Sequence, residues 1–341
     1  MRRRWRILIG FAIVVIALLA INTVVLDSET KPAEITAENG RIVELDSVDL
    51  QLVEMPATDP VPRGEGAPIV LLHCYACSLH WWDRFVPLIN ENHRVVAIDL
   101  IGFGGSQKPK SGYAIDQQAR AVSEAMNGLG LRGAVVVGHS MGGDVATAVA
   151  EGASELVSRV ALIGTPSESG QAKLPFLSDL IYTPVIGEAV WRLRPDFAIR
   201  DAYESAFAPG FDYEAAFSNP NQVVEDNRAM TYTSFDRAEA ESLQFSDAGT
   251  IAARITAVGV PLLAIFGSED QVVDAAAAAQ SFEAVPGAEV RIFDGVGHSP
   301  NVEAPADTAE SLLRFAGAGS PGGANLEPGV AGADDSAAET G

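Results

Sequence analysis

The chain is poor in cysteine, with only Cys74 and Cys77 among its 341 residues. A zinc site needs about four ligands and no second cysteine pair exists to complete one, so we expect no bound metal and no other cofactor. A redox pair is one interpretation of the C-x-x-C spacing, and it requires a thiol-exchange fold around the pair. The other is a turn with two small side chains, disulfide-linked if the domain is exported.

Basic residues are scarce as well: 23 Lys and Arg stand against 45 Asp and Glu, which gives a formal net charge of -22. Nucleic acid and anionic lipid surfaces repel a chain this acidic, so nucleic-acid binding is excluded. Hydrophobic residues make up 48% of the chain, enough for the sizeable core of one large domain or two modest ones.

Charge is absent from one long stretch, Ile7 to Leu26, which follows a basic segment at residues 1–6. A helix of about twenty residues spans about 30 Å, the thickness of the hydrocarbon layer of a membrane. Basic flanks stay in the cytoplasm, which sends the rest of the chain across. We therefore predict a transmembrane anchor at residues 7–26, with the membrane as its partner, and an extracytoplasmic domain.

A cleaved signal peptide is the alternative for this stretch, and cleavage would leave the domain secreted. The apolar run is longer than the usual hydrophobic region of about 7–15 residues. The sequence that follows, Asn22-Thr23-Val24, is a poor cleavage site. Both observations favour the uncleaved anchor.

The rest of the chain alternates between short apolar runs and helical patterns. A polar linker at residues 27–40 precedes residues 41–54, whose alternation predicts a β-hairpin. The later runs lack alternation, as strands buried on both faces do: Ile69–Leu72, Val95–Ile98, Ala134–Val137, Val160–Ile163, Leu262–Phe266 and Val290–Phe293. Helical patterns lie between them, at Gln117–Leu129, Ala275–Val285 and Pro305–Ala316. We predict an α/β fold, a three-layer α/β/α sandwich around a mostly parallel sheet, from residues 41–166 and 251–316.

Two segments depart from this alternation. Residues 167–250 are rich in aromatic side chains, Phe176 among them, and lack short β-branched runs. We expect a helical insertion there, with the aromatics mainly as its own core. Residues 317–341 are rich in Gly, Ala, Pro and acidic residues and contain no Lys or Arg, a composition that predicts a disordered acidic tail.

The strongest motif is Gly138-His139-Ser140-Met141-Gly142-Gly143, between a predicted strand and a predicted helix. A G-x-S-x-G pattern in this setting is typical of a nucleophile elbow, a tight turn that exposes Ser140 in a strained conformation. Gly138 and Gly142 are needed because side chains at these positions would collide across the turn.

A serine hydroxyl needs a general base, and the chain offers five histidines. His139 lies inside the elbow, and His73 ends a buried strand. His80 lies beside two tryptophans, and His93 lies in a charged turn. His298 remains, in a loop after the last predicted strand, and the chain order serine, acid, histidine favours it.

The acid that orients the histidine is predicted to be Asp270. It follows the strand Leu262–Phe266, and ligands bind outside the carboxyl ends of such strands. Glu269 and Asp274 are rivals that we interpret as surface charges, and Asp294 is too near His298 in sequence.

Two backbone amides are expected to form an oxyanion hole. The helix that begins after Ser140 presents free amides at its N-terminus, and the Met141 amide is the natural first donor. The second donor is expected from the loop after the strand Ile69–Leu72, and the Tyr75 amide is the best candidate.

Together these motifs resemble the α/β-hydrolase superfamily, over roughly residues 68–316. In addition, Asp99-Leu100-Ile101-Gly102-Phe103-Gly104-Gly105-Ser106 looks like the family's loop after the following strand, and residues 167–250 are similar to its helical cap. One departure is His73-Cys74, where the family usually has His-Gly.

The resemblance implies a serine hydrolase that uses Ser140, Asp270 and His298 on a small-molecule carboxylic ester. The aromatic cap and the membrane segment suggest an apolar or lipid-like acyl group. The same three residues would serve a carbon–carbon bond hydrolase or a lactone hydrolase. A non-catalytic scaffold with this fold is the alternative from another class.

Overall fold

A computed structural model of the chain describes residues 2–26, 29–58, 66–172, 181–183 and 187–317. Within them lies a sheet of eight strands in the order β1-β2-β4-β3-β5-β6-β7-β8. The strands are β1 (Gly40–Glu44), β2 (Asp49–Met55), β3 (Ile69–Leu72), β4 (Val95–Ile98), β5 (Ala134–His139), β6 (Val157–Ile163), β7 (Leu262–Gly267) and β8 (Glu289–Phe293). The hairpin and every short run predicted as a strand are confirmed.

Strand direction changes only at one side of the sheet. β1 pairs with β2 and β2 with β4 in antiparallel register, whereas the pairs from β4 to β8 are parallel. All six residues of β5 and of β7 are buried, because helices cover both faces of a parallel sheet. The carboxyl ends of β3, β5, β6 and β7 therefore meet at one edge.

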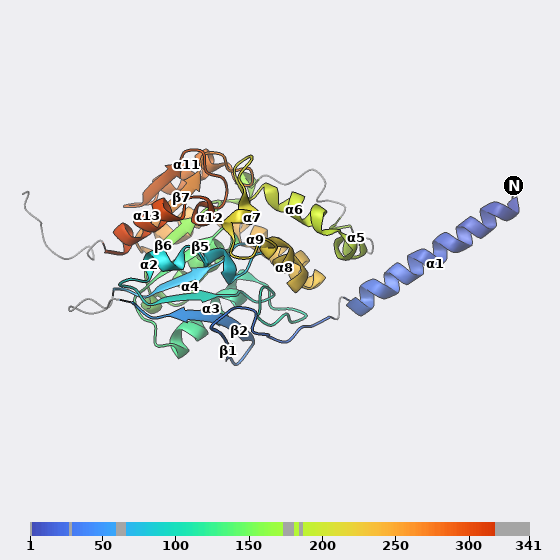
Figure 1. Ribbon diagram of the computed structural model, residues 1–341, viewed down its shortest axis with the longest axis horizontal. Coiled ribbons are helices and arrows are strands. Elements are labelled where there is room, and N and C mark those ends of the chain that lie inside the picture. Colours follow the sequence, from blue (N-terminus) through green and yellow to red (C-terminus); the bar gives the residue numbers. More distant parts are fainter. Residues whose placement is uncertain (1, 27–28, 59–65, 173–180, 184–186, 318–341) are drawn as a thin grey trace, which may run out of the picture.

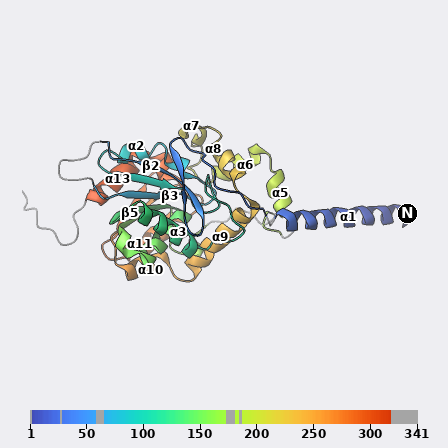
Figure 2. The same cartoon turned by 90° about the horizontal axis from the view of Figure 1, so that it is seen from below.

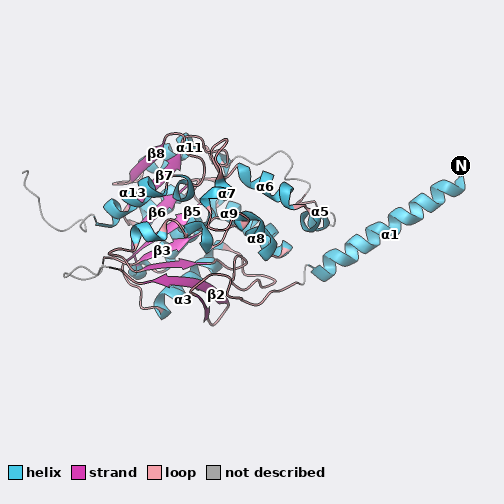
Figure 3. Ribbon diagram, in the orientation of Figure 1, coloured by secondary structure: helices cyan, strands magenta, loops and turns pink. Residues whose placement is uncertain are grey.

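Helices pack on both faces of the sheet, as Figures 1 and 3 show. Alternate residues of β3 point to opposite sides: Val70 and Leu72 join one core cluster, and Ile69 and Leu71 the other. The first cluster includes residues of α3 (Ile115–Gly128), α4 (Met141–Gly152), α10 (Ile251–Val258) and α11 (Ala275–Glu283). The second includes residues of η1 (Leu79–Trp82), α2 (Val86–Ile89) and α13 (Pro305–Gly317). The three-layer sandwich is therefore as predicted.

A group of helices between β6 and β7 forms the insertion. It contains η3 (Ser169–Gln171), α5 (Gly187–Leu193), α6 (Asp196–Glu204), α7 (Tyr213–Ala216), α8 (Gln222–Ala229) and α9 (Tyr232–Asp247). Most of its aromatic side chains are buried: Trp191, Tyr203, Phe207, Tyr213, Phe217, Phe235 and Phe245. These seven residues belong to one core cluster together with residues of α3 and α4, so the insertion shares its core with the α/β domain, and a separate core for the insertion stays a prediction. Phe176 and residues 318–341 of the predicted tail lie outside the described residues, whereas Gly317 is the last residue of α13.

The N-terminal helix α1 (Arg2–Leu26) stands apart from the sheet and leaves the domain next to α5 (Figures 1 and 2). Its segment Arg4–Ile21 has a mean hydropathy of 2.2 and is not buried, so it is long and apolar enough to cross a membrane. The next described residues, expected as a linker, are bonded to the domain. Glu29 pairs with Arg192 at 2.5 Å, and Lys31 donates to the carbonyl oxygen of Met230.

Candidate active site

The turn between β5 and α4 gives Ser140 an unusual backbone conformation. Its φ of 52° and ψ of -119° lie outside the regions that residues with a side chain normally occupy. Neighbouring strands hold the turn in place. The Ser140 amide donates to the Ile163 carbonyl oxygen at 2.8 Å, and the Ser140 carbonyl oxygen accepts from Gly143 N at 2.8 Å and Thr165 Oγ1 at 3.1 Å. Strain that the surroundings hold in this way is typical of a nucleophile elbow.

Two glycines let the segments of the turn approach closely. A Cβ atom on Gly138 would lie 2.2 Å from the carbonyl oxygen of Gly142. One on Gly142 would lie 2.4 Å and 2.6 Å from the carbonyl oxygens of Leu72 and His73. The N-terminus of α4 therefore lies directly against the end of β3 and the start of the loop that follows it.

Asp270 and His298 form a buried pair at the ends of β7 and β8. His298 Nδ1 lies 2.8 Å from Asp270 Oδ2, and the two side chains are 5% and 0% exposed. Asp270 Oδ1 accepts from the amides of Val272 and Val273 at 2.7 and 2.8 Å. Burial alone would raise the pKa of Asp270, but the imidazole and these two amides outweigh it and lower the pKa below its usual value. The carboxylate is therefore ionised and able to orient His298.

His298 lies against the residues that flank Ser140 in space. Its carbonyl oxygen is 3.0 Å from His139 Nε2, and the two imidazole rings are 5.2 Å apart. A Cβ atom on Gly164, next to the Ile163 that binds the Ser140 amide, would lie 3.1 Å from His298 Nδ1. The Ser140 hydroxyl donates no hydrogen bond within the described part of the chain. Such bonds often form only when substrate binds.

The rival acids lie elsewhere. Glu269 is exposed at the surface. Asp274 is also exposed, and its carboxylate caps α11 by accepting from the Ala277 amide. Asp294 is exposed and accepts from Ser268 Oγ. Of the four acids considered, Asp270 is the one that the structure brings to His298.

The two predicted oxyanion donors are unused within the described residues. Met141 is the first residue of α4, and neither its amide nor that of Tyr75 donates to an acceptor there. Tyr75 lies in a turn closed by a disulfide between Cys74 and Cys77. The question that the sequence left open for these cysteines is therefore answered by a disulfide.

Three supporting residues were not predicted as part of the site. His139 supports the His298 backbone, and His73 accepts from the Leu100 amide through Nε2. Glu303, on the short helix α12 (Pro300–Glu303), accepts from the amides of Gly297 and Ser299 on either side of His298. Its carboxylate also accepts from the Ala208 amide, so the histidine loop is tied to the insertion.

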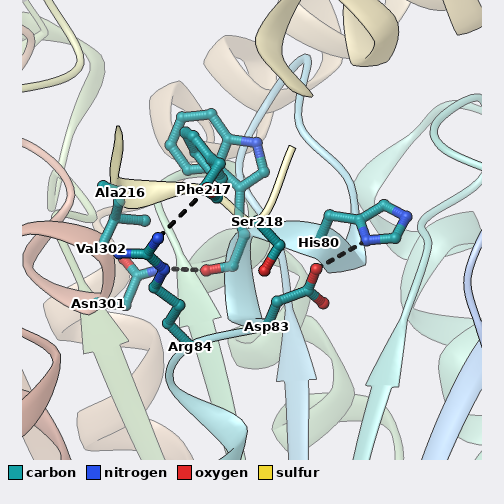
Figure 4. Close-up of a pocket in the computed structure, with 9 residues that line it drawn as sticks. His80, Asp83, Arg84, Ala216, Phe217, Ser218, Asn301 and Val302 are labelled. Carbon is teal, nitrogen blue, oxygen red and sulfur yellow. Dashed lines mark hydrogen bonds and ion pairs between the residues drawn. The ribbon is translucent and has the colours of Figure 1, made fainter. Parts of the chain in front are cut away.

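The face of the insertion next to these residues is aromatic. Trp81 stacks on Phe207 with ring centroids 5.6 Å apart, and Tyr75 packs against Phe235 at 5.6 Å. A surface hollow is lined by His80, Trp81, Asp83, Arg84, Ala216, Phe217, Ser218, Asn301 and Val302 (Figure 4). None of Ser140, Asp270 and His298 lines it, so the hollow is separate from the candidate site.

Comparison with known proteins gives a consistent result. Residues 67–305 match the family model described as alpha/beta hydrolase fold. The chain is 27% identical to a 2-hydroxy-6-oxo-6-(2'-aminophenyl)hexa-2,4-dienoic acid hydrolase of Metapseudomonas resinovorans, covering 74% of this chain and 84% of that protein. It is 28% identical to Lipase 3 of a Moraxella species, covering 73% of this chain and 77% of that protein. The structure resembles an enol-lactonase from Burkholderia xenovorans, with a TM-score of 0.64 and 22% identity over 81% of this chain and 99% of the other.

Proposed function

The chain belongs to the α/β hydrolase fold family, and we propose that it is a serine hydrolase that cleaves an apolar carboxylic ester through an acyl-enzyme on Ser140. The observation that carries this proposal is the buried Asp270–His298 pair, which lies against the residues that hold the strained Ser140 turn. Its relatives in the family include proteins named as hydrolases and a lipase.

In the acylation step, His298 takes the hydroxyl proton of Ser140, and Ser140 attacks the ester carbonyl carbon. Asp270 keeps the proton on Nδ1, so Nε2 is the nitrogen free to act as base. The amides of Tyr75 and Met141 stabilise the negative charge that develops on the carbonyl oxygen. The histidine then protonates the leaving alcohol.

Deacylation repeats the sequence with water as the nucleophile. His298 takes a proton from water, and the resulting tetrahedral adduct collapses to the free acid and the Ser140 hydroxyl. The aromatic insertion, with Phe207 and Phe235 near Trp81 and Tyr75, offers an apolar wall for the acyl group. This wall and the N-terminal helix support a lipid-like substrate.

Two neighbours favour a second candidate within the same chemistry. One relative is named as a dienoic acid hydrolase, and one structural neighbour is an enol-lactonase. A carbon–carbon bond or lactone hydrolase would use the same serine, histidine and aspartate. A panel of esters of increasing acyl length, run beside lactones, distinguishes these substrates by their kcat/KM values.

A fluorophosphonate probe is expected to label the purified chain at Ser140. The probe reacts with a serine only when a base activates its hydroxyl, so labelling separates an enzyme from a scaffold that keeps only the fold. Labelling is read by gel fluorescence and located by peptide mass spectrometry. Ser140→Ala should remove it, whereas Ser158→Ala, a serine bonded to carbonyl oxygens at the opposite end of the sheet, should not. Failure of the folded wild-type chain to react would contradict the proposal.

We further propose that α1 anchors the chain in the membrane with the domain on the extracytoplasmic side. The Arg4–Ile21 segment has the required length and hydropathy, and the basic residues precede it.

Carbonate washing of membranes is expected to leave the full chain in the pellet. Carbonate releases proteins that bind the membrane surface through charge, whereas a spanning helix is held by burial of its apolar side chains in the hydrocarbon layer. An arginine near the bilayer centre costs about 2.5–3.5 kcal/mol, so Ile13→Arg/Ile16→Arg should move the protein to the soluble fraction. Recovery of the wild-type chain as a shortened soluble form would show cleavage instead.

A further inference from the structure

The loop after β3 contains a disulfide that the proposed reaction does not use. Cys74 and Cys77 are joined with their Cα atoms 5.3 Å apart, and both residues are buried. The link brackets Tyr75, whose amide is the proposed second oxyanion donor. Its two sulfur atoms are therefore next to the site but outside the reacting groups.

The peptide group between Cys74 and Tyr75 is held through its oxygen. His73 Nε2 accepts from the Leu100 amide, so the ring proton is on Nδ1, which lies 2.7 Å from the Cys74 oxygen. The Cys77 amide donates to the same oxygen at 3.3 Å. In a planar trans peptide the N–H points away from the C=O, so fixing this oxygen directs the Tyr75 N–H to the opposite side.

The turn that these bonds close is strained. Ala76 has a φ of 57°, in the left-handed region that a residue with a Cβ atom avoids. The hydrogen bond from the Cys77 amide to the Cys74 carbonyl oxygen, at 3.3 Å, is at the long end of the usual range. Since the linked cysteines are only three positions apart, the disulfide removes little freedom from the unfolded chain, and its main effect is expected to be local.

Two hydroxyl groups tie the same loop to the insertion. Tyr203 of α6 donates to the Ala76 carbonyl oxygen, and the Tyr75 hydroxyl donates to the Phe235 carbonyl oxygen at 2.8 Å. These bonds hold the Tyr75 side chain and the Ala76 carbonyl group. Neither holds the peptide plane between Cys74 and Tyr75, which depends on His73 and on the closed turn.

We infer that the Cys74–Cys77 disulfide is a positioning element that keeps the Tyr75 amide directed at the oxyanion formed on Ser140. This inference rests on the proposed function. Two electrons and two protons convert the disulfide to two thiols and let the turn relax around Ala76. The amide then stabilises the transition state less, while substrate binding in the ground state is unchanged, so kcat falls and KM does not.

The test compares the full-length wild-type chain with Cys74→Ala/Cys77→Ala. Titration of a sample of each with a fluorophosphonate counts the reactive serines, so that kcat is expressed per reactive serine. Loss of one oxyanion donor costs about 10²–10³ in kcat, so a displaced amide is expected to cost about tenfold to a hundredfold, with KM within about twofold. Reduction of the wild type by a phosphine should give the same loss; the phosphine supplies the two electrons, and water supplies the two thiol protons and the oxygen of the phosphine oxide that forms. The double variant under reduction is the matched control and should not change further.

The outcomes separate this inference from the proposed function. An unchanged kcat per reactive serine in the double variant, even with a lower Tm, would overturn the inference and leave the serine hydrolase intact. No labelling of the oxidised wild type would overturn both. If the double variant does not fold, the reduced wild type, with its free thiols counted by alkylation and mass spectrometry, provides the same comparison.

Discussion

Replacing His298 by alanine is expected to lower kcat for a p-nitrophenyl ester by about 10⁴-fold or more, and Ser140→Ala should do the same. Without the imidazole the serine hydroxyl keeps its proton, and without the hydroxyl there is no atom to acylate. Rates are measured at saturating ester with purified full-length protein. Thermal unfolding checks that each variant is folded.

The two losses should not add. Serine and histidine act on one proton in one step, so Ser140→Ala/His298→Ala should be no slower than either single variant. His80→Ala serves as the control, because His80 pairs with Asp83 beside the separate surface hollow. Wild-type activity in either single variant would mean that a different residue carries the chemistry.

The sheet and its helices could be predicted because their determinants are local. The short apolar runs bounded by turns form β3, β4 and β5 in the structure, with bounds that differ little from the predicted ones. The elbow was equally readable, since Gly138 and Gly142 are needed for contacts within a few residues and against the adjacent strand. The chain order of serine, acid and histidine then selected Asp270 and His298, which the structure places 2.8 Å apart.

The supporting contacts could not be predicted, because they join residues far apart in the chain. The bond from His139 to the His298 carbonyl oxygen spans 159 positions, and that from Tyr203 to Ala76 spans 127. No pattern in the sequence marks such pairs. The C-x-x-C spacing permitted both a disulfide and a redox pair, and the structure has the disulfide. Nothing in the sequence around Glu303 indicates that its carboxylate binds the amides of Gly297 and Ser299.

Asp270→Asn is expected to lower kcat by about 10⁴-fold while leaving the fold and KM close to those of the wild type. The asparagine carbonyl oxygen still accepts from the amides of Val272 and Val273, which Asp270 Oδ1 binds now. Its NH2 group then faces His298 Nδ1, where the carboxylate accepted a hydrogen bond from the Nδ1–H group. The imidazole is forced to the tautomer with its proton on Nε2, so it no longer acts as a base toward Ser140.

Glu269→Gln is the matched control for this variant, because Glu269 is the adjacent acid and its side chain is exposed. Its kcat should stay within about twofold of the wild type, since surface charges have small effects. Equal losses in the two variants would indicate a general effect of charge near the site and would remove Asp270 from the proposed mechanism.

Asp270→Asn should also change how the free energy of unfolding depends on pH. Burial would raise the pKa of Asp270, but His298 and the two amides outweigh it and hold the pKa below the ordinary 3.8. A depressed folded-state pKa contributes stability that is complete above the unfolded value and is lost as pH falls through the folded value. The difference in unfolding free energy between wild type and Asp270→Asn, measured with urea, should therefore narrow below about pH 4. A difference that widens in acid would mean that the carboxyl group is protonated in the folded chain and cannot orient the imidazole.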